Sequence, residues 1–87
     1  MFAVYIIYSK KIDKYYIGYS SNVQERLCYH NWNSKGFSNK GKPWILVYSE
    51  PFSTKTEALK REKQLKNWKN RDLLEKLIRS TGSEHPD

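Results

Sequence analysis

The chain has 87 residues, of which 38% are apolar and 15% aromatic, and this length excludes two separately folded cores but supports one compact domain. Sixteen Lys and Arg against nine acidic residues give a net charge of +7, which favours a polyanionic partner, nucleic acid before membrane, although solubility alone also explains such a charge. No apolar run reaches the roughly 20 residues of a membrane span, and the first residues lack the features of a signal peptide. The single cysteine excludes an internal disulfide, so we expect a cytoplasmic protein.

The beginning of the chain predicts a β-hairpin. Residues 2–9 (FAVYIIYS) and 15–20 (YYIGYS) are rich in β-branched and aromatic residues, which favour strands. Only a short polar turn, KKIDK, separates them. Such a short connection favours antiparallel pairing of the two strands.

A helix is predicted directly after the hairpin. Two residues suited to cap its N-terminus, each followed three residues later by Gln or Glu, are Ser21 and Asn22. The helix is expected to run from about Val23 to Asn31, with Leu27 and, as a further candidate, Cys28 facing inward.

The second half of the chain predicts a loop, a strand and two helices. The loop covers residues 32–43, and the apolar run 44–50 suits a buried central strand that Pro51 ends. Thr54 and Glu57 form a capping box for the next helix, in which the lysines and Arg61 are expected to face solvent. Asn70 is the expected cap of a third helix, residues 70–79.

The predicted order of elements, ββαβαα, defines the fold class. It indicates an α+β domain in which a small three-stranded antiparallel sheet is flanked by helices. Residues 1–80 are expected to form this single domain, and residues 81–87 a frayed tail.

Four residues of the first half of this fold could meet at one place. Tyr5 and Tyr16 lie on the two strands of the hairpin, where their hydroxyls could share a face. Arg26 and His30 are four residues apart and therefore lie on one face of the first helix. Gly18 marks either a sharp turn or a close approach of another part of the chain.

This pattern, AVY…YIG…R…H followed by the helical segment REKQLK, resembles the GIY-YIG nuclease superfamily, and in particular its small members that consist of little beyond the nuclease module. The resemblance covers roughly residues 2–79. The YIG triplet at 16–18 and the arginine ten residues after its tyrosine match the family, whereas Ala3-Val4-Tyr5 keeps only the tyrosine of the first triplet.

The resemblance implies metal-dependent hydrolysis of phosphodiester bonds. By similarity, Tyr5 is the base or water-orienting phenol, and His30 accepts or relays its proton. Tyr16 hydrogen-bonds phosphate or water, Arg26 binds the phosphate oxygens, and Glu62 is the single carboxylate ligand of Mg²⁺, with Mn²⁺ as a substitute. We expect these five side chains to converge on one open concave surface.

Substrate binding is expected to involve the loop and the glycine of the YIG triplet. Phosphate contacts are predicted for Gly18, Lys35, Lys40 and Lys42, and the aromatic residues Trp32 and Phe37 could stack on an unpaired base. DNA is the expected substrate in preference to RNA, and a partner protein or a homodimer could supply specificity. A role in DNA repair or recombination follows from family analogy.

Three alternative interpretations remain open at this level. The chain could be a nucleic-acid-binding domain of the same fold without turnover, or an interaction module that uses the apolar face of the third helix. Glu62 alone could serve only as the i, i+4 ion-pair partner of Lys66.

Overall fold

The computed structural model describes residues 1–32 and 40–83. The order of the described elements confirms the predicted α+β fold. The elements are β1 (Phe2–Ser9), β2 (Lys14–Ser20), α1 (Val23–Trp32), β3 (Trp44–Phe52), α3 (Lys55–Trp68) and α4 (Arg71–Ser83). Helix α4 extends four residues past its predicted end at residue 79, and the predicted tail from residue 84 onward lies outside the described part of the chain. None of the described helices is long and apolar enough to cross a membrane.

The sheet has the strand order β2-β1-β3, and both pairings are antiparallel. Strand β1 is therefore central, and its residues from Val4 to Ile7 are almost completely buried. The prediction that residues 44–50 form the central strand was wrong, because β3 lies at an edge and its Ile45 is 55% exposed. Pro51 does not end β3, which continues to Phe52. An edge strand tolerates proline because only one side of it takes part in the hydrogen-bonded ladder.

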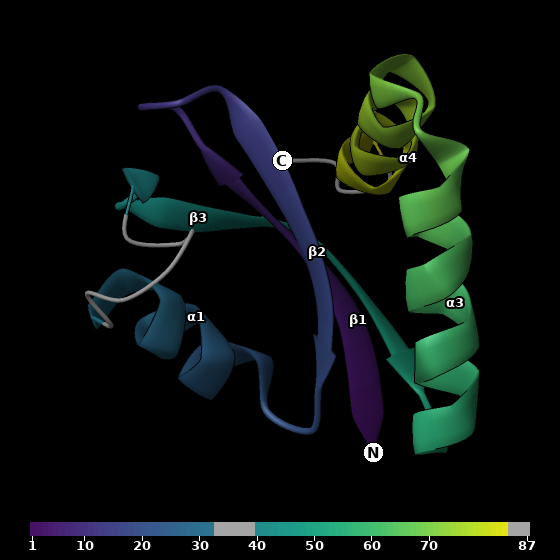
Figure 1. Ribbon diagram of the computed structural model, residues 1–87. Coiled ribbons are helices and arrows are strands. Elements are labelled where there is room, and N and C mark those ends of the chain that lie inside the picture. The colour runs from purple at the N-terminus through teal and green to yellow at the C-terminus, as the bar shows by residue number, and fades with distance from the viewer. Residues whose placement is uncertain (33–39, 84–87) are drawn as a thin grey trace.

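Helices cover both faces of the sheet (Figure 1). Because side chains alternate along a strand, Val4 and Ile6 pack toward α3 and α4, whereas Tyr5 and Ile7 face α1. The chain thus builds two small cores that share the central strand, and it places Tyr5 in the core beneath α1.

Side-chain caps begin α1, α3 and α4 as the sequence predicts. The backbone N–H of Glu25 donates to Asn22 Oδ1 at 3.1 Å, and that of Glu57 donates to Thr54 Oγ1 at 3.2 Å. The third cap is Asn70, whose Oδ1 accepts from the N–H of Leu73 at 3.2 Å. These bonds satisfy backbone donors that have no partner within the helix.

Two side chains differ from their predicted positions. Cys28 is exposed on α1 and does not face the core. Arg61 does not simply face solvent, because its Nε donates to Glu50 of β3 at 2.9 Å and its guanidinium lies over the ring of Trp68. Helical periodicity could not predict this contact, since it depends on which edge of the sheet α3 covers.

An ionic cluster joins the start of α4 to the turn between β1 and β2. Arg71 donates to the Asp13 carboxylate at 2.6 Å and to Glu75 at 3.1 Å. Asp13 also accepts a hydrogen bond from the hydroxyl of Tyr8, and Glu75 accepts one from that of Tyr15. The hydrogen bonds from Arg71 are the main cause of the lowered pKa of both carboxyl groups.

Candidate active site

A buried pair of side chains, Tyr5 and His30, lies at the centre of the site. Tyr5 Oη is 3.1 Å from His30 Nε2, and the two residues are only 1% and 3% exposed. Tyr5 reaches this position because odd-numbered residues of β1 face α1, and His30 because it lies in the last turn of that helix. A phenol and an imidazole in hydrogen-bond contact can exchange a proton.

Gly18 makes room for Tyr5. The two residues are directly opposite each other in the β1–β2 pairing, and a Cβ added at residue 18 would lie 2.6 Å from Tyr5 Oη. Strand β2 continues to Ser20, so the turn that the sequence allowed at Gly18 is not present. The glycine instead allows the tyrosine ring to lie across the edge strand, with its hydroxyl close to the free edge of the sheet.

Tyr16 and Arg26 complete the cluster on this face. The Tyr16 ring packs edge-on against His30, with 4.6 Å between the ring centroids. The guanidinium of Arg26, one helical turn before His30, lies 4.6 Å from the ring centre of Tyr29 and acts electrostatically on both Tyr5 and His30. The structure therefore brings together four of the five side chains that the sequence predicts to converge.

The electrostatics of the pair favour a neutral phenol beside a neutral imidazole. Burial raises the pKa of Tyr5, and the hydrogen-bonding and charge of Arg26 act in the opposite direction. Burial, together with the positive charge of Arg26, lowers the pKa of His30. Its Nδ1 is buried and has no hydrogen-bond partner among the described residues. A neutral imidazole can accept a hydrogen bond from the Tyr5 hydroxyl.

Glu62 approaches from the other face of the sheet. It belongs to α3, whereas Arg26 and His30 belong to α1, and the two helices cover opposite faces (Figure 1). Its side chain is 13% exposed and lies 3.4 Å from Lys66 Nζ, so the predicted ion pair is present. The Glu62 charge is also close enough to contribute to the raised pKa of Tyr5. This contribution is the smallest of those that act on Tyr5, and among the described residues no hydrogen bond or ion pair joins the acid to the phenol.

The donor set fits a cation that keeps most of its water. Among residues 1–32 and 40–83, no three His, Cys, Asp or Glu side chains are grouped to hold a metal ion. Glu62 would thus be a lone carboxylate ligand. Mg²⁺ accepts such a site because it retains several waters and takes further oxygens from a substrate phosphate.

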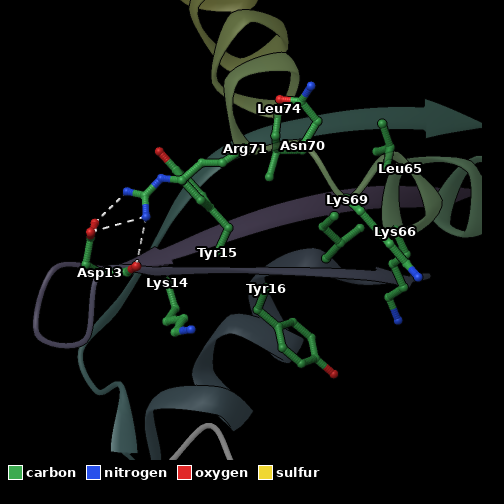
Figure 2. A pocket seen from close by; sticks show the side chains of 11 residues that line it. Asp13, Lys14, Tyr15, Tyr16, Leu65, Lys66, Lys69, Asn70, Arg71 and Leu74 are labelled. Atoms are coloured by element: carbon green, nitrogen blue, oxygen red, sulfur yellow. Dashed lines mark hydrogen bonds and ion pairs between the residues drawn. The ribbon is translucent and has the colours of Figure 1, made fainter.

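Sequence reasoning missed a groove of about 520 Å³ at the edge strand β2. Tyr16 extends from β2 on the side opposite to Arg71 and Leu74 of α4 (Figure 2). Lys66 and Lys69 at the end of α3 line the same groove. The groove thus lies at the free edge of the sheet, where Tyr16 lines it, whereas Tyr5, Arg26, His30 and Glu62 do not. No sequence signal indicated it, because its walls come from separate elements.

The predicted loop contacts are only partly described. Lys40 is exposed and Lys42 is partly exposed, whereas Lys35 and Phe37 lie outside the described residues. Trp32 is 83% exposed at the end of α1, as a base-stacking residue requires. The role of these residues in substrate binding stays a prediction.

Comparison with known proteins places the chain among small proteins of similar length. The family model described as the GIY-YIG catalytic domain matches residues 1–77. UPF0213 protein SH2523 of Staphylococcus haemolyticus is 37% identical over 76 residues, which cover 85% of this chain and 90% of the relative. UPF0213 protein SSP2268 of Staphylococcus saprophyticus is 39% identical over 77 residues, which cover 86% and 90%. UPF0213 protein VNG_2274C of Halobacterium salinarum is 38% identical over 53 residues, which cover 60% and 69%. No solved structure matches the chain.

Proposed function

The chain belongs to the family of the GIY-YIG catalytic domain, a nuclease fold whose substrates are nucleic acids, and on that premise we propose that it is an endonuclease that hydrolyses phosphodiester bonds in DNA with Mg²⁺ or Mn²⁺. The observation that carries this proposal is the buried Tyr5–His30 pair with Arg26 beside it. Any buried phenol needs a hydrogen-bond partner, and what favours turnover is that this partner is a titratable imidazole with an arginine beside it.

Each of these residues has a role in attack on a phosphate. In the reaction, water attacks phosphorus in line with the leaving oxygen, and negative charge increases on the remaining oxygens. The phenol of Tyr5 orients the water, or its oxygen takes the proton of the water while its own hydroxyl proton passes to His30. The guanidinium of Arg26 offers a planar set of donors to the phosphate oxygens.

The remaining two residues, Tyr16 and Glu62, complete the proposed reaction centre. Tyr16 can donate its hydroxyl hydrogen to a phosphate oxygen or to the attacking water. A divalent cation held by Glu62 would supply charge stabilisation for the leaving oxygen. Selectivity for branched or flapped DNA, and a role in repair or recombination, belong to the same proposal and rest on family analogy.

A nicking assay tests the proposal. Purified protein is incubated with supercoiled plasmid, flap DNA and branched DNA in the presence of Mg²⁺, Mn²⁺ or EDTA. We expect metal-dependent nicking that Arg26→Ala abolishes while DNA binding survives, because the arginine is required for the reaction itself. Arg79→Ala removes an exposed arginine of α4 and should cut like the parent. Equal cutting by both variants would contradict the assignment.

The second candidate is a DNA-binding domain without turnover. It is favoured by one observation, the ion pair that engages Glu62 Oε2 with Lys66 and so competes with a metal ion for this carboxylate. This function predicts DNA affinity that falls steeply with salt and no cleavage with either metal ion.

A further inference from the structure

The groove along β2 contains more positive charge than its structural role requires. Its lining includes four cationic residues, Lys14, Lys66, Lys69 and Arg71, and one acid, Asp13. Arg71 is neutralised by its ion pairs with Asp13 and Glu75. Lys14 and Lys69 make no ion pair with any residue of the described ranges, and Lys66 pairs only with Glu62. The groove therefore presents lysine charge that no neighbouring acid fully balances.

Lys69 occupies a backbone position that does not suit a lysine. It is the C-cap of α3 and has a φ of 47° and a ψ of 33°, in the left-handed region. Glycine is the usual residue in this conformation, because any side chain with a Cβ is disfavoured there. This conformation ends α3, and it leaves the lysine side chain in the lining of the groove.

The groove adjoins the candidate active site through two of its lining residues. Tyr16 lines it and also packs against His30. Lys66 lines it and also pairs with Glu62. A strand lying in the groove would thus contact residues that neighbour His30 and Glu62.

From these observations we propose that the groove at β2 binds the backbone of the substrate strand next to the scissile phosphate, with Lys14, Lys66 and Lys69 as phosphate contacts. This proposal rests on the function proposed above. It assigns positioning of the substrate to the edge of β2 and the turn between α3 and α4, in addition to the loop that contains Lys40 and Lys42. Lysine contacts to phosphate position a strand without reading its sequence.

The test compares two pairs of charge-removing substitutions. One variant, Lys14→Gln/Lys69→Gly, changes the groove, and the control, Lys55→Gln/Lys60→Gln, removes the same charge from exposed positions of α3 outside it. The affinity for a fluorescein-labelled DNA duplex is measured by anisotropy in EDTA, between about 50 and 200 mM salt. Glycine suits the backbone at residue 69, so Lys14→Gln/Lys69→Gly should melt at or above the temperature of the parent. A second groove variant, Lys14→Gln/Lys69→Gln, keeps the Cβ at residue 69.

Counterion release sets the expected size of the effect. Each lost phosphate contact should make the slope of log affinity against log salt shallower by about 0.9, which corresponds to about an 8-fold loss of affinity at 0.1 M salt. Both groove variants should therefore lose affinity by tens of fold, whereas the control should stay within about 2-fold of the parent. Parental affinity and slope in the groove variants, or an equal loss in the control, would overturn the proposal.

Binding in EDTA separates this proposal from the endonuclease activity. If the parent binds through the groove lysines but never nicks DNA with Mg²⁺ or Mn²⁺, the groove assignment holds and the endonuclease proposal fails. If the parent nicks DNA and the groove variants bind and cut equally well, only the groove assignment is wrong. No salt-dependent DNA binding by the parent would overturn both.

Discussion

Gly18→Ala should damage the candidate active site by a purely steric effect. The new Cβ would lie 2.6 Å from Tyr5 Oη and 2.7 Å from its Cζ. Restoring an ordinary contact of about 3.4 Å requires the hydroxyl to move by about 0.8 Å. Tyr5 is 1% exposed and cannot swing into solvent, so the shift must come from the packed ring or from the backbone of β2.

The cost of this substitution can be worked out from two effects. Overpacking a well-filled core costs about 1 to 3 kcal/mol. Displacing the hydroxyl from His30 adds the loss of a hydrogen bond, about 1 kcal/mol. Alanine is more favourable than glycine in a strand by about 0.5 to 1 kcal/mol, which offsets part of this cost. We therefore expect the free energy of unfolding to fall by roughly 1 to 3.5 kcal/mol, a large part of the stability of a small domain. Nicking should be lost as well, because the proton acceptor no longer meets the phenol.

A double-mutant cycle measured by urea unfolding identifies the cause. In a Tyr5→Leu background the clash is absent, and alanine in a strand is more favourable than glycine by about 0.5 to 1 kcal/mol. Gly18→Ala should then be neutral or stabilising. An equal destabilisation in both backgrounds would show that the glycine is required for a reason other than room for Tyr5.

Three further predictions concern the cap of α3, the buried histidine and the ionic cluster at α4. Thr54→Ala removes the acceptor for the N–H of Glu57 and should lower the free energy of unfolding by about 1 kcal/mol in urea titrations, whereas Thr56→Ala, at an exposed position of the same helix, should change it little. Burial lowers the pKa of His30 in the folded state, so the histidine of the unfolded chain is protonated first as the pH falls below about 6.5. The free energy of unfolding should therefore fall between pH 7.5 and 5, and it should fall less in His30→Gln. Parallel pH profiles of the two proteins would contradict this. Arg71 lowers the pKa of Asp13 and Glu75 in the folded state. In thermal melts, the parent should therefore be more stable than Arg71→Ala at pH 7, and this difference should shrink as the pH falls below about 4. A difference that is constant with pH would contradict this.

The local features of the fold were predictable because they depend on neighbouring residues. Each helix cap consists of a side chain and a backbone N–H three residues later, which the sequence shows directly. Strand pairing is different. The runs at β1 and β3 are both apolar, and β1 is central because both of its edges pair with other strands, which the pattern of apolar residues does not show. The partner of Arg61 was unpredictable as well, since Glu50 comes within reach only through the packing of α3 on the sheet.

The candidate site was predictable where a motif fixes it. The family pattern indicated Tyr5, Tyr16, Arg26 and His30, and the structure brings these four together. The pattern could not show that Gly18 serves as space for the Tyr5 ring, because this depends on the register of β1 and β2. The groove has no motif at all, since its charge comes from residues of β2, α3 and α4 that are far apart in sequence.

The central claim is that residues from both layers act as one hydrolytic centre, and single-turnover nicking by Arg26→Ala, Glu62→Gln and the double variant tests it most directly. Residues that act as a unit in one transition state are strongly non-additive. With protein in excess and DNA binding verified for each variant, we expect each single variant to lose nearly all of the parental rate and the double variant to be no slower. Cutting by Glu62→Gln at the parental rate, while Arg26→Ala is inactive, would show that the acid of α3 has no part in the reaction.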